Sequence, residues 1–130
     1  MLEQVEARFT DILRPLFPKE AEFRFLNPKS DDLSWSIKWR LNNDPDRPSK
    51  RSRPIILVLS QDVLEDYNDS DNHKRADLEK IITKKVAECL DTFEPNHDAP
   101  YGLPVPGERW VLIYDRRRNI VVNREAAQLP

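Results

Sequence analysis

Oxygen-bearing side chains recur at alternate positions in residues 66–77, a spacing typical of loops that bind calcium. The residues that share this spacing are Asp66, Asn68, Ser70, Asn72 and Asp77. A calcium loop has a glycine at its sixth position, where this chain has Asp71, and ends in a bidentate glutamate rather than an aspartate. We therefore interpret the segment as an acidic turn that caps the next helix, and we predict no metal ion there.

Histidine and cysteine offer little further chemistry. A transition-metal site would have to combine His73 with Asp69 and Asp71, and one histidine beside flexible carboxylates is more typical of an exposed surface. The single cysteine, Cys89, falls on the apolar stripe of a predicted helix, where a thiol usually packs without reacting. These residues do not predict a catalytic centre.

The chain has two glycines, Gly102 and Gly107, and neither lies in a glycine-rich turn between a strand and a helix. Phosphate-cradling loops and dinucleotide-binding turns need the close backbone approach that glycine permits. The sequence therefore excludes both kinds of site. We predict no cofactor and no catalytic residue, and an enzymatic function is not favoured.

Basic residues form the strongest candidate for a binding site. Segment 33–54 has a net charge of +4, whereas segment 55–100 has a net charge of −6. The candidate anion-binding residues are Lys38, Arg40, Arg47, Lys50, Arg51, Arg53, Arg116, Arg117 and Arg118. If they converge, they can follow the phosphates of a nucleic acid or another polyanion. The alternative is that polar loops and hairpin turns are charged for solubility, and a pI of about 5.7 argues against a dedicated nucleic-acid binder.

Residues 33–41, LSWSIKWRL, predict the central strand of the fold. Apolar and polar residues alternate without a break, so one face of this strand is apolar and the other polar. Trp35 and Trp39 share the apolar face with Ile37, and two indoles there require a large apolar cover. We expect both tryptophans in the core.

Two amphipathic helices can supply that cover. The first runs from Leu2 to about Arg14, where Pro15 and Pro18 end it. The second and longer helix runs from about Asp71 to Phe93, after a short helix at 61–67. Its predicted apolar face consists of Leu78, Ile81, Ile82, Val86, Cys89, Leu90 and Phe93.

Further strands are predicted at 20–26, 55–59, 109–114 and 120–122, the last two forming a hairpin around a polar turn. Residues 55–59, IILVL, are apolar on both faces, which indicates a strand covered on both sides or by a partner chain. Residues 42–54 predict an exposed basic loop, 94–107 a proline-rich connector and 124–130 a frayed tail.

These elements predict one α+β domain over residues 1–130: an antiparallel sheet of about five strands, in the order α-β-β-β-α-α-β-β, with the first and the long helix on one face. We expect a non-catalytic interaction or structural domain that forms a homo-oligomer or binds a protein partner. The alternative is nucleic-acid or polyanion binding through 47–53 and 116–118. A cytoplasmic location is expected because Cys89 cannot form an internal disulfide and no basic and apolar leader opens the chain. No apolar run approaches the roughly 20 residues of a membrane span.

Overall fold

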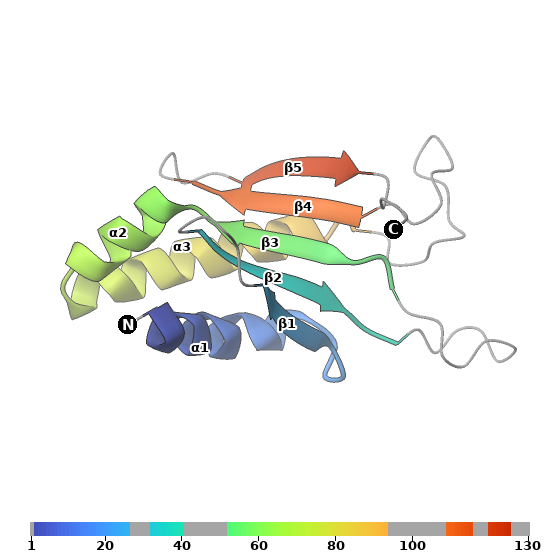
Figure 1. Ribbon diagram of the computed structural model, residues 1–130, viewed down its shortest axis with the longest axis horizontal. Coiled ribbons are helices and arrows are strands. Elements are labelled where there is room, and N and C mark those ends of the chain that lie inside the picture. Colours follow the sequence, from blue (N-terminus) through green and yellow to red (C-terminus); the bar gives the residue numbers. More distant parts are fainter. Residues whose placement is uncertain (1, 27–31, 41–51, 94–108, 116–119, 126–130) are drawn as a thin grey trace, which may run out of the picture.

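Five strands form one sheet in the order in which they occur along the chain, as Figure 1 shows. The computed structural model describes residues 2–26, 32–40, 52–93, 109–115 and 120–125. The strands are β1 (Glu22–Leu26), β2 (Leu33–Lys38), β3 (Ile55–Leu59), β4 (Arg109–Tyr114) and β5 (Ile120–Glu125). The predicted α+β class with an N-terminal and a long central helix is confirmed.

The sheet is mixed, so the prediction of a purely antiparallel sheet is wrong at one pair of strands. β3 and β4 are parallel, with Ile55 opposite Trp110 and Leu59 opposite Tyr114. Between them, α2 (Gln61–Asp69) and α3 (Asn72–Leu90) carry the chain back to the end of the sheet where β3 began. Such a crossover makes the next strand parallel, whereas a tight hairpin makes it antiparallel. The other neighbouring pairs are antiparallel.

The helices cover one face of this sheet. α1 (Leu2–Leu13) buries Val5, Phe9 and Leu13, which recur at four-residue spacing along one side of the helix. The helix gives way to a short 3₁₀ turn, η1 (Arg14–Leu16), because Pro15 has no backbone N–H to continue the α-helical pattern. α3, which lies along the sheet in Figure 1, buries Ile82 and Val86 in the same core. Within the described residues, no helix is long and apolar enough to cross a membrane.

Trp35 on β2 and Trp39, which directly follows β2, both lie in the core, as the sequence predicts. Trp35 is 0% exposed and Trp39 is 8% exposed. The Trp35 indole N–H donates to Thr10 Oγ1 on α1 at 3.0 Å, so its polar atom is satisfied inside the core. The Trp39 ring lies 5.8 Å from that of Phe93, just after α3, which in turn lies 5.1 Å from the ring of Trp110 on β4. These aromatic contacts join the strands to the long helix.

The acidic segment between α2 and α3 caps a helix, in agreement with the sequence interpretation. Asp71 is the N-cap of α3, and its carboxylate accepts the backbone N–H of Lys74 at 2.9 Å. At the start of α2, the N–H of Gln61 donates to the carboxylate of Asp32 at 2.8 Å. The described residues, which include all of 66–77, contain no group of three or more His, Cys, Asp or Glu side chains placed to hold a metal ion.

Glu79 joins the three helices. Its carboxylate accepts two hydrogen bonds from Arg8 on α1, at 2.9 and 3.0 Å, and one from the Tyr67 hydroxyl on α2, at 2.7 Å. The hydrogen bond from Arg8 lowers the pKa of Glu79 below its ordinary value of 4.5; burial opposes this shift, and the Tyr67 hydroxyl adds to it. The stabilisation is therefore present above the unfolded-state pKa and is lost as the pH falls through the lower folded-state pKa.

We expect Glu79→Gln to lower the free energy of unfolding by about 1 kcal/mol at pH 7, because the amide removes the charge and replaces one of the two acceptor oxygens by an N–H₂ donor. Below about pH 4 the difference from the unmodified protein should shrink toward zero, since the protonated carboxyl then resembles the amide. Urea unfolding across this pH range measures both effects. Glu88→Gln, at an exposed position of the same helix, is the control and should change stability by less than about 0.5 kcal/mol. A pH-independent difference would contradict the role of the charge.

Candidate interaction surface

The face of the sheet that points away from the helices carries a continuous apolar surface. Side chains alternate along each strand, so the fully buried Leu57 and Leu112 mark the helix side and their neighbours mark the opposite side. We call the apolar side chains on this opposite side the open-face patch. Its members are Ile56, Val58, Val111, Ile113 and Val121, and Leu26 lies on the same face but is separated from them by Ser34.

The register of the strands places these side chains in two adjacent rows. In one row Ile113 lies between Val58 on one neighbouring strand and Val121 on the other. In the second row Ile56 lies opposite Val111. Side chains directly opposite each other on one sheet face are in contact range, with Cβ atoms about 4.5–5.5 Å apart. The patch is therefore contiguous across β3, β4 and β5.

The patch is partly exposed, with polar and charged residues on one flank. Val121 is 43% exposed, and the other members are partly buried. On β2, the patch gives way to Ser34 and Ser36. Beyond these serines the same face carries Glu22 and Arg24 on β1, two exposed charges of opposite sign. An apolar surface beside a mixed-charge rim is typical of a protein–protein interface.

Of the nine predicted anion-binding residues, three lie in the part of the chain that the structure describes. Lys38 and Arg40 are exposed and occupy alternate positions of one chain segment, so they share the open face. Arg53 is 2% exposed and does not present its guanidinium to solvent. The remaining six, Arg47, Lys50, Arg51, Arg116, Arg117 and Arg118, lie outside the described residues. Polyanion binding through this set stays a prediction.

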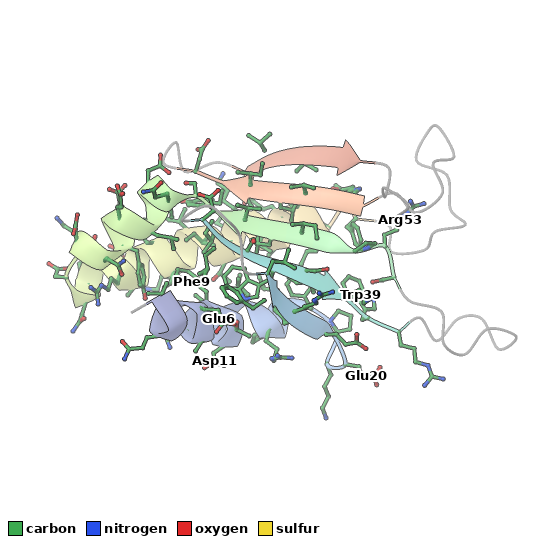
Figure 2. All side chains as sticks on the ribbon, in the orientation of Figure 1. Glu6, Phe9, Asp11, Glu20, Trp39 and Arg53 are labelled. Atoms are coloured by element: carbon green, nitrogen blue, oxygen red, sulfur yellow. The ribbon has the colours of Figure 1, made fainter. Side chains whose placement is uncertain are left out.

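The expectation that 42–54 is exposed throughout is wrong at Ser52 and Arg53, because the backbone there pairs with the end of the tryptophan segment. The N–H of Ser52 donates to the carbonyl of Trp39 at 2.7 Å, and the Ser52 hydroxyl accepts the N–H of Trp39 at 3.0 Å. Figure 2 shows Trp39 and Arg53 at the same end of the sheet. Strand pairing therefore begins before Ile55, and it draws Arg53 into the interior.

The patch is larger than the sequence interpretation indicated. From the sequence, only residues 55–59 were interpreted as a strand with apolar residues on both faces that a partner chain could cover. The same signal was present in 109–114, where Val111 and Ile113 alternate with the core residues Trp110, Leu112 and Tyr114. What the pattern did not reveal is that these strands are adjacent, since residues 60–108 separate them. Adjacency turns two apolar strand faces into one surface.

Cys89 lies on α3 and is only partly buried among the core residues that it contacts. Burial raises the pKa of its thiol, and the nearby Glu88 carboxylate raises it further, so the reactive thiolate is scarce at neutral pH. We expect Ellman's reagent to label the native protein at pH 7 much more slowly than the protein unfolded in urea. Equal labelling rates in the two states would contradict this prediction.

Comparison of the chain with protein-family models, with curated proteins and with solved structures gave no match. The function is therefore inferred from the surfaces of this structure.

Proposed function

We propose that this chain is a non-catalytic interaction domain that self-associates by packing its open-face patch against the same patch of a second copy. The observation that supports the proposal most strongly is the contiguous apolar surface across β3, β4 and β5 on the face opposite the helices. In a monomer these side chains would remain in contact with water, at a cost proportional to their apolar area. A cytoplasmic location belongs to the same proposal.

A second copy is the partner that this surface fits best. Sheets pack face to face at about 10 Å with apolar side chains interdigitated, and the patch supplies only aliphatic side chains. In a two-fold dimer each surface meets itself, so a strongly charged face would repel its copy. Here the charges lie on the flank, beyond Ser34 and Ser36: Glu22, Arg24, Lys38 and Arg40. A two-fold arrangement that packs the aliphatic rows at the centre keeps these charges at the rim, where the Glu22 of one copy can face a cation of the other and water screens the remaining cations.

The size of the sheet limits the affinity. Five strands about 4.8 Å apart and about five residues long give a flat face of roughly 19 by 17 Å. A pair of such faces spans roughly 650 Å², about half the lower limit of standard protein–protein interfaces, which bury about 1,200–2,000 Å² in total. We therefore expect a reversible dimer with a dissociation constant in the micromolar range, about 1–100 µM.

Sedimentation velocity over about 1 µM to 1 mM protein tests this proposal, since the range spans the expected dissociation constant. The mass should rise from 15.3 kDa at the low end toward twice that value at the high end. A mass that stays at the monomer value up to the highest concentration would overturn self-association.

A further inference from the structure

A groove of about 520 Å³ lies between α1 and α3. Every residue that lines it belongs to one of these two helices, and most of the lining surface is apolar. Small or aliphatic side chains form the apolar part of the lining: Ile12, Ala76, Thr83 and Ala87. Charged side chains form the rest: Arg8, Glu79, Lys80 and Lys84. We call this site the helix groove.

The two walls of the helix groove are fixed relative to each other. Arg8 on α1 donates two hydrogen bonds to the carboxylate of Glu79 on α3, at 2.9 and 3.0 Å. Beneath them, Phe9 of α1 and Ile82 of α3 are fully buried in the same core. The hydroxyl of Thr83 donates to the carbonyl of Glu79 at 2.7 Å, so its hydrogen is satisfied within the helix. A partner therefore meets a preformed groove and loses little entropy in ordering it.

The charge that the helix groove presents to a partner is positive. Arg8 and Glu79 form an ion pair, which leaves the ammonium groups of Lys80 and Lys84 in the lining. These two lysines are exposed and lie one turn apart on the same side of α3. Within the part of the chain that the structure describes, neither of them forms an ion pair. Like charges at this spacing repel each other, and carboxylates from a partner would relieve that repulsion.

The neighbouring carboxylates of α3 lie outside the helix groove and have cations of their own. Asp77 lies 3.7 Å from His73, and Glu88 lies 4.0 Å from Lys85. Neither carboxylate is part of the lining. The two lysines of the groove therefore remain available to a partner, although segment 55–100 is acidic as a whole.

The shape and the charge of the helix groove together fit an amphipathic helix. A groove between two helices accepts the side-chain ridge of a third, and alanines such as Ala76 and Ala87 allow a close approach. Aliphatic side chains of the partner would pack on Ile12 and on the methylene stems of the two lysines. Carboxylates one turn apart on the partner match the spacing of Lys80 and Lys84. A phosphate backbone would match the lysines but leave the apolar lining without a partner.

We propose that the helix groove binds an acidic amphipathic helix of a partner protein. The site goes beyond self-association, since it is built from α1 and α3 and the open-face patch lies on the opposite side of the sheet. A dimer formed through the open-face patches would leave the groove of each copy accessible. Each copy could then bind one partner helix.

The test is a titration of the full chain with a designed helical peptide of about 15 residues, which has leucines along one face and two glutamates one turn apart beside them. Methyl NMR locates the peptide. We expect saturable shifts at Ile12 and Ala87, with a dissociation constant of about 0.1 mM. The same peptide with glutamine at both glutamate positions should bind at least about fivefold more weakly. Equal affinity of the two peptides, or shifts confined to Ile113 and its neighbours on the open face, would overturn the proposal.

Two charge-matched double variants complete the test. Lys80→Gln with Lys84→Gln removes both ammonium groups from the helix groove, and we expect it to weaken the glutamate peptide about fivefold to tenfold. Lys19→Gln with Lys74→Gln removes two exposed ammonium groups outside the groove and should weaken binding by less than about twofold. Both variants should keep the thermal midpoint of the parent, because all four lysines are exposed. Equal weakening by both variants would overturn the site.

Discussion

Trp35→Ala is expected to lower the free energy of unfolding by about 3–5 kcal/mol, the largest effect on stability that we predict for a single substitution. The Trp35 side chain is fully buried between the sheet and α1, so its removal leaves a cavity that the surrounding strands cannot fill. The substitution also removes the indole N–H that Thr10 accepts. A loss of this size is a large part of the roughly 5–15 kcal/mol that stabilises a typical domain.

Chemical denaturation measures this loss, and Phe25→Ala is the matched control. Phe25 lies opposite Trp35 on β1, and their ring centres are 6.5 Å apart, but Phe25 is 38% exposed. Its removal should therefore cost about 1 kcal/mol. If Trp35→Ala costs no more than Phe25→Ala, the tryptophan is not a core residue and the packing of α1 on the sheet is wrong.

Ile113→Lys is expected to raise the dissociation constant of the dimer at least about a hundredfold. Ile113 lies in the centre of one row of the open-face patch, between Val58 and Val121. In a two-fold dimer the substitution places two ammonium groups in the apolar interface, each at a desolvation cost of several kcal/mol. The monomer should remain folded, because the position is partly exposed and faces away from the core.

Two neighbouring valines of β5 provide a control that shows which face of the sheet forms the dimer contact. Val121 is 43% exposed and lies opposite Ile113 on the open face, whereas Val122 is 39% exposed and lies opposite the core residue Leu112. Val121→Lys should weaken the dimer about tenfold, and Val122→Lys by less than about twofold. Sedimentation velocity measures both variants. Equal effects would place the contact at the edge of β5 rather than on the open face.

Local pattern predicts most of the elements of this fold. Strict alternation identified the tryptophan strand, since a period of two allows one buried face. Pro15 marked the end of the first helix because it cannot continue the hydrogen-bond ladder. That the acidic turn caps the long helix followed from the way short acidic side chains hydrogen-bond nearby backbone N–H groups, and the structure identifies Asp71 as the capping residue. Each of these features depends on residues close together in the sequence.

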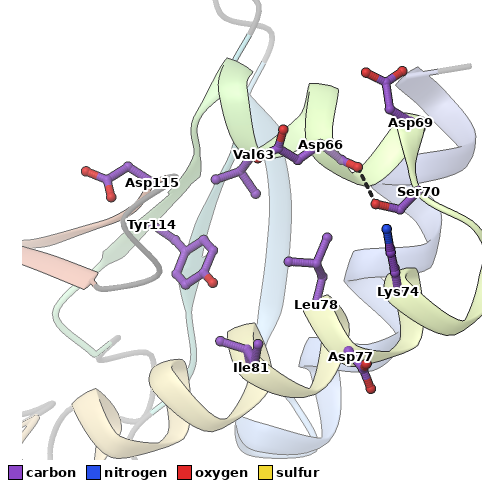
Figure 3. Close-up of a pocket in the computed structure, with 10 residues that line it drawn as sticks. All are labelled: Val63, Asp66, Asp69, Ser70, Lys74, Asp77, Leu78, Ile81, Tyr114 and Asp115. Carbon is purple, nitrogen blue, oxygen red and sulfur yellow. Dashed lines mark hydrogen bonds between the residues drawn. The ribbon is translucent and has the colours of Figure 1, made fainter.

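The features that sequence did not predict depend on residues far apart in it. The parallel pairing of β3 and β4 follows from the path of the chain through α2 and α3, which side-chain periodicity does not encode. Arg53 is buried because the backbone of Ser52 pairs with that of Trp39. A cavity of about 430 Å³ between α2, α3 and the end of β4 (Figure 3) is lined by residues from Val63 to Asp115, so no local motif could reveal it.

Intermolecular methyl contacts test the self-association most directly. Ile56, Val58 and Ile113 all carry methyl groups on the open face, so a sample that mixes two differently isotope-labelled copies can report contacts between them. At millimolar concentration we predict intermolecular nuclear Overhauser effects among these methyl groups, and none from Ile82 or Val86 in the core. If intermolecular contacts arise only from the helices or are absent, the open-face patch is not the surface through which this protein self-associates.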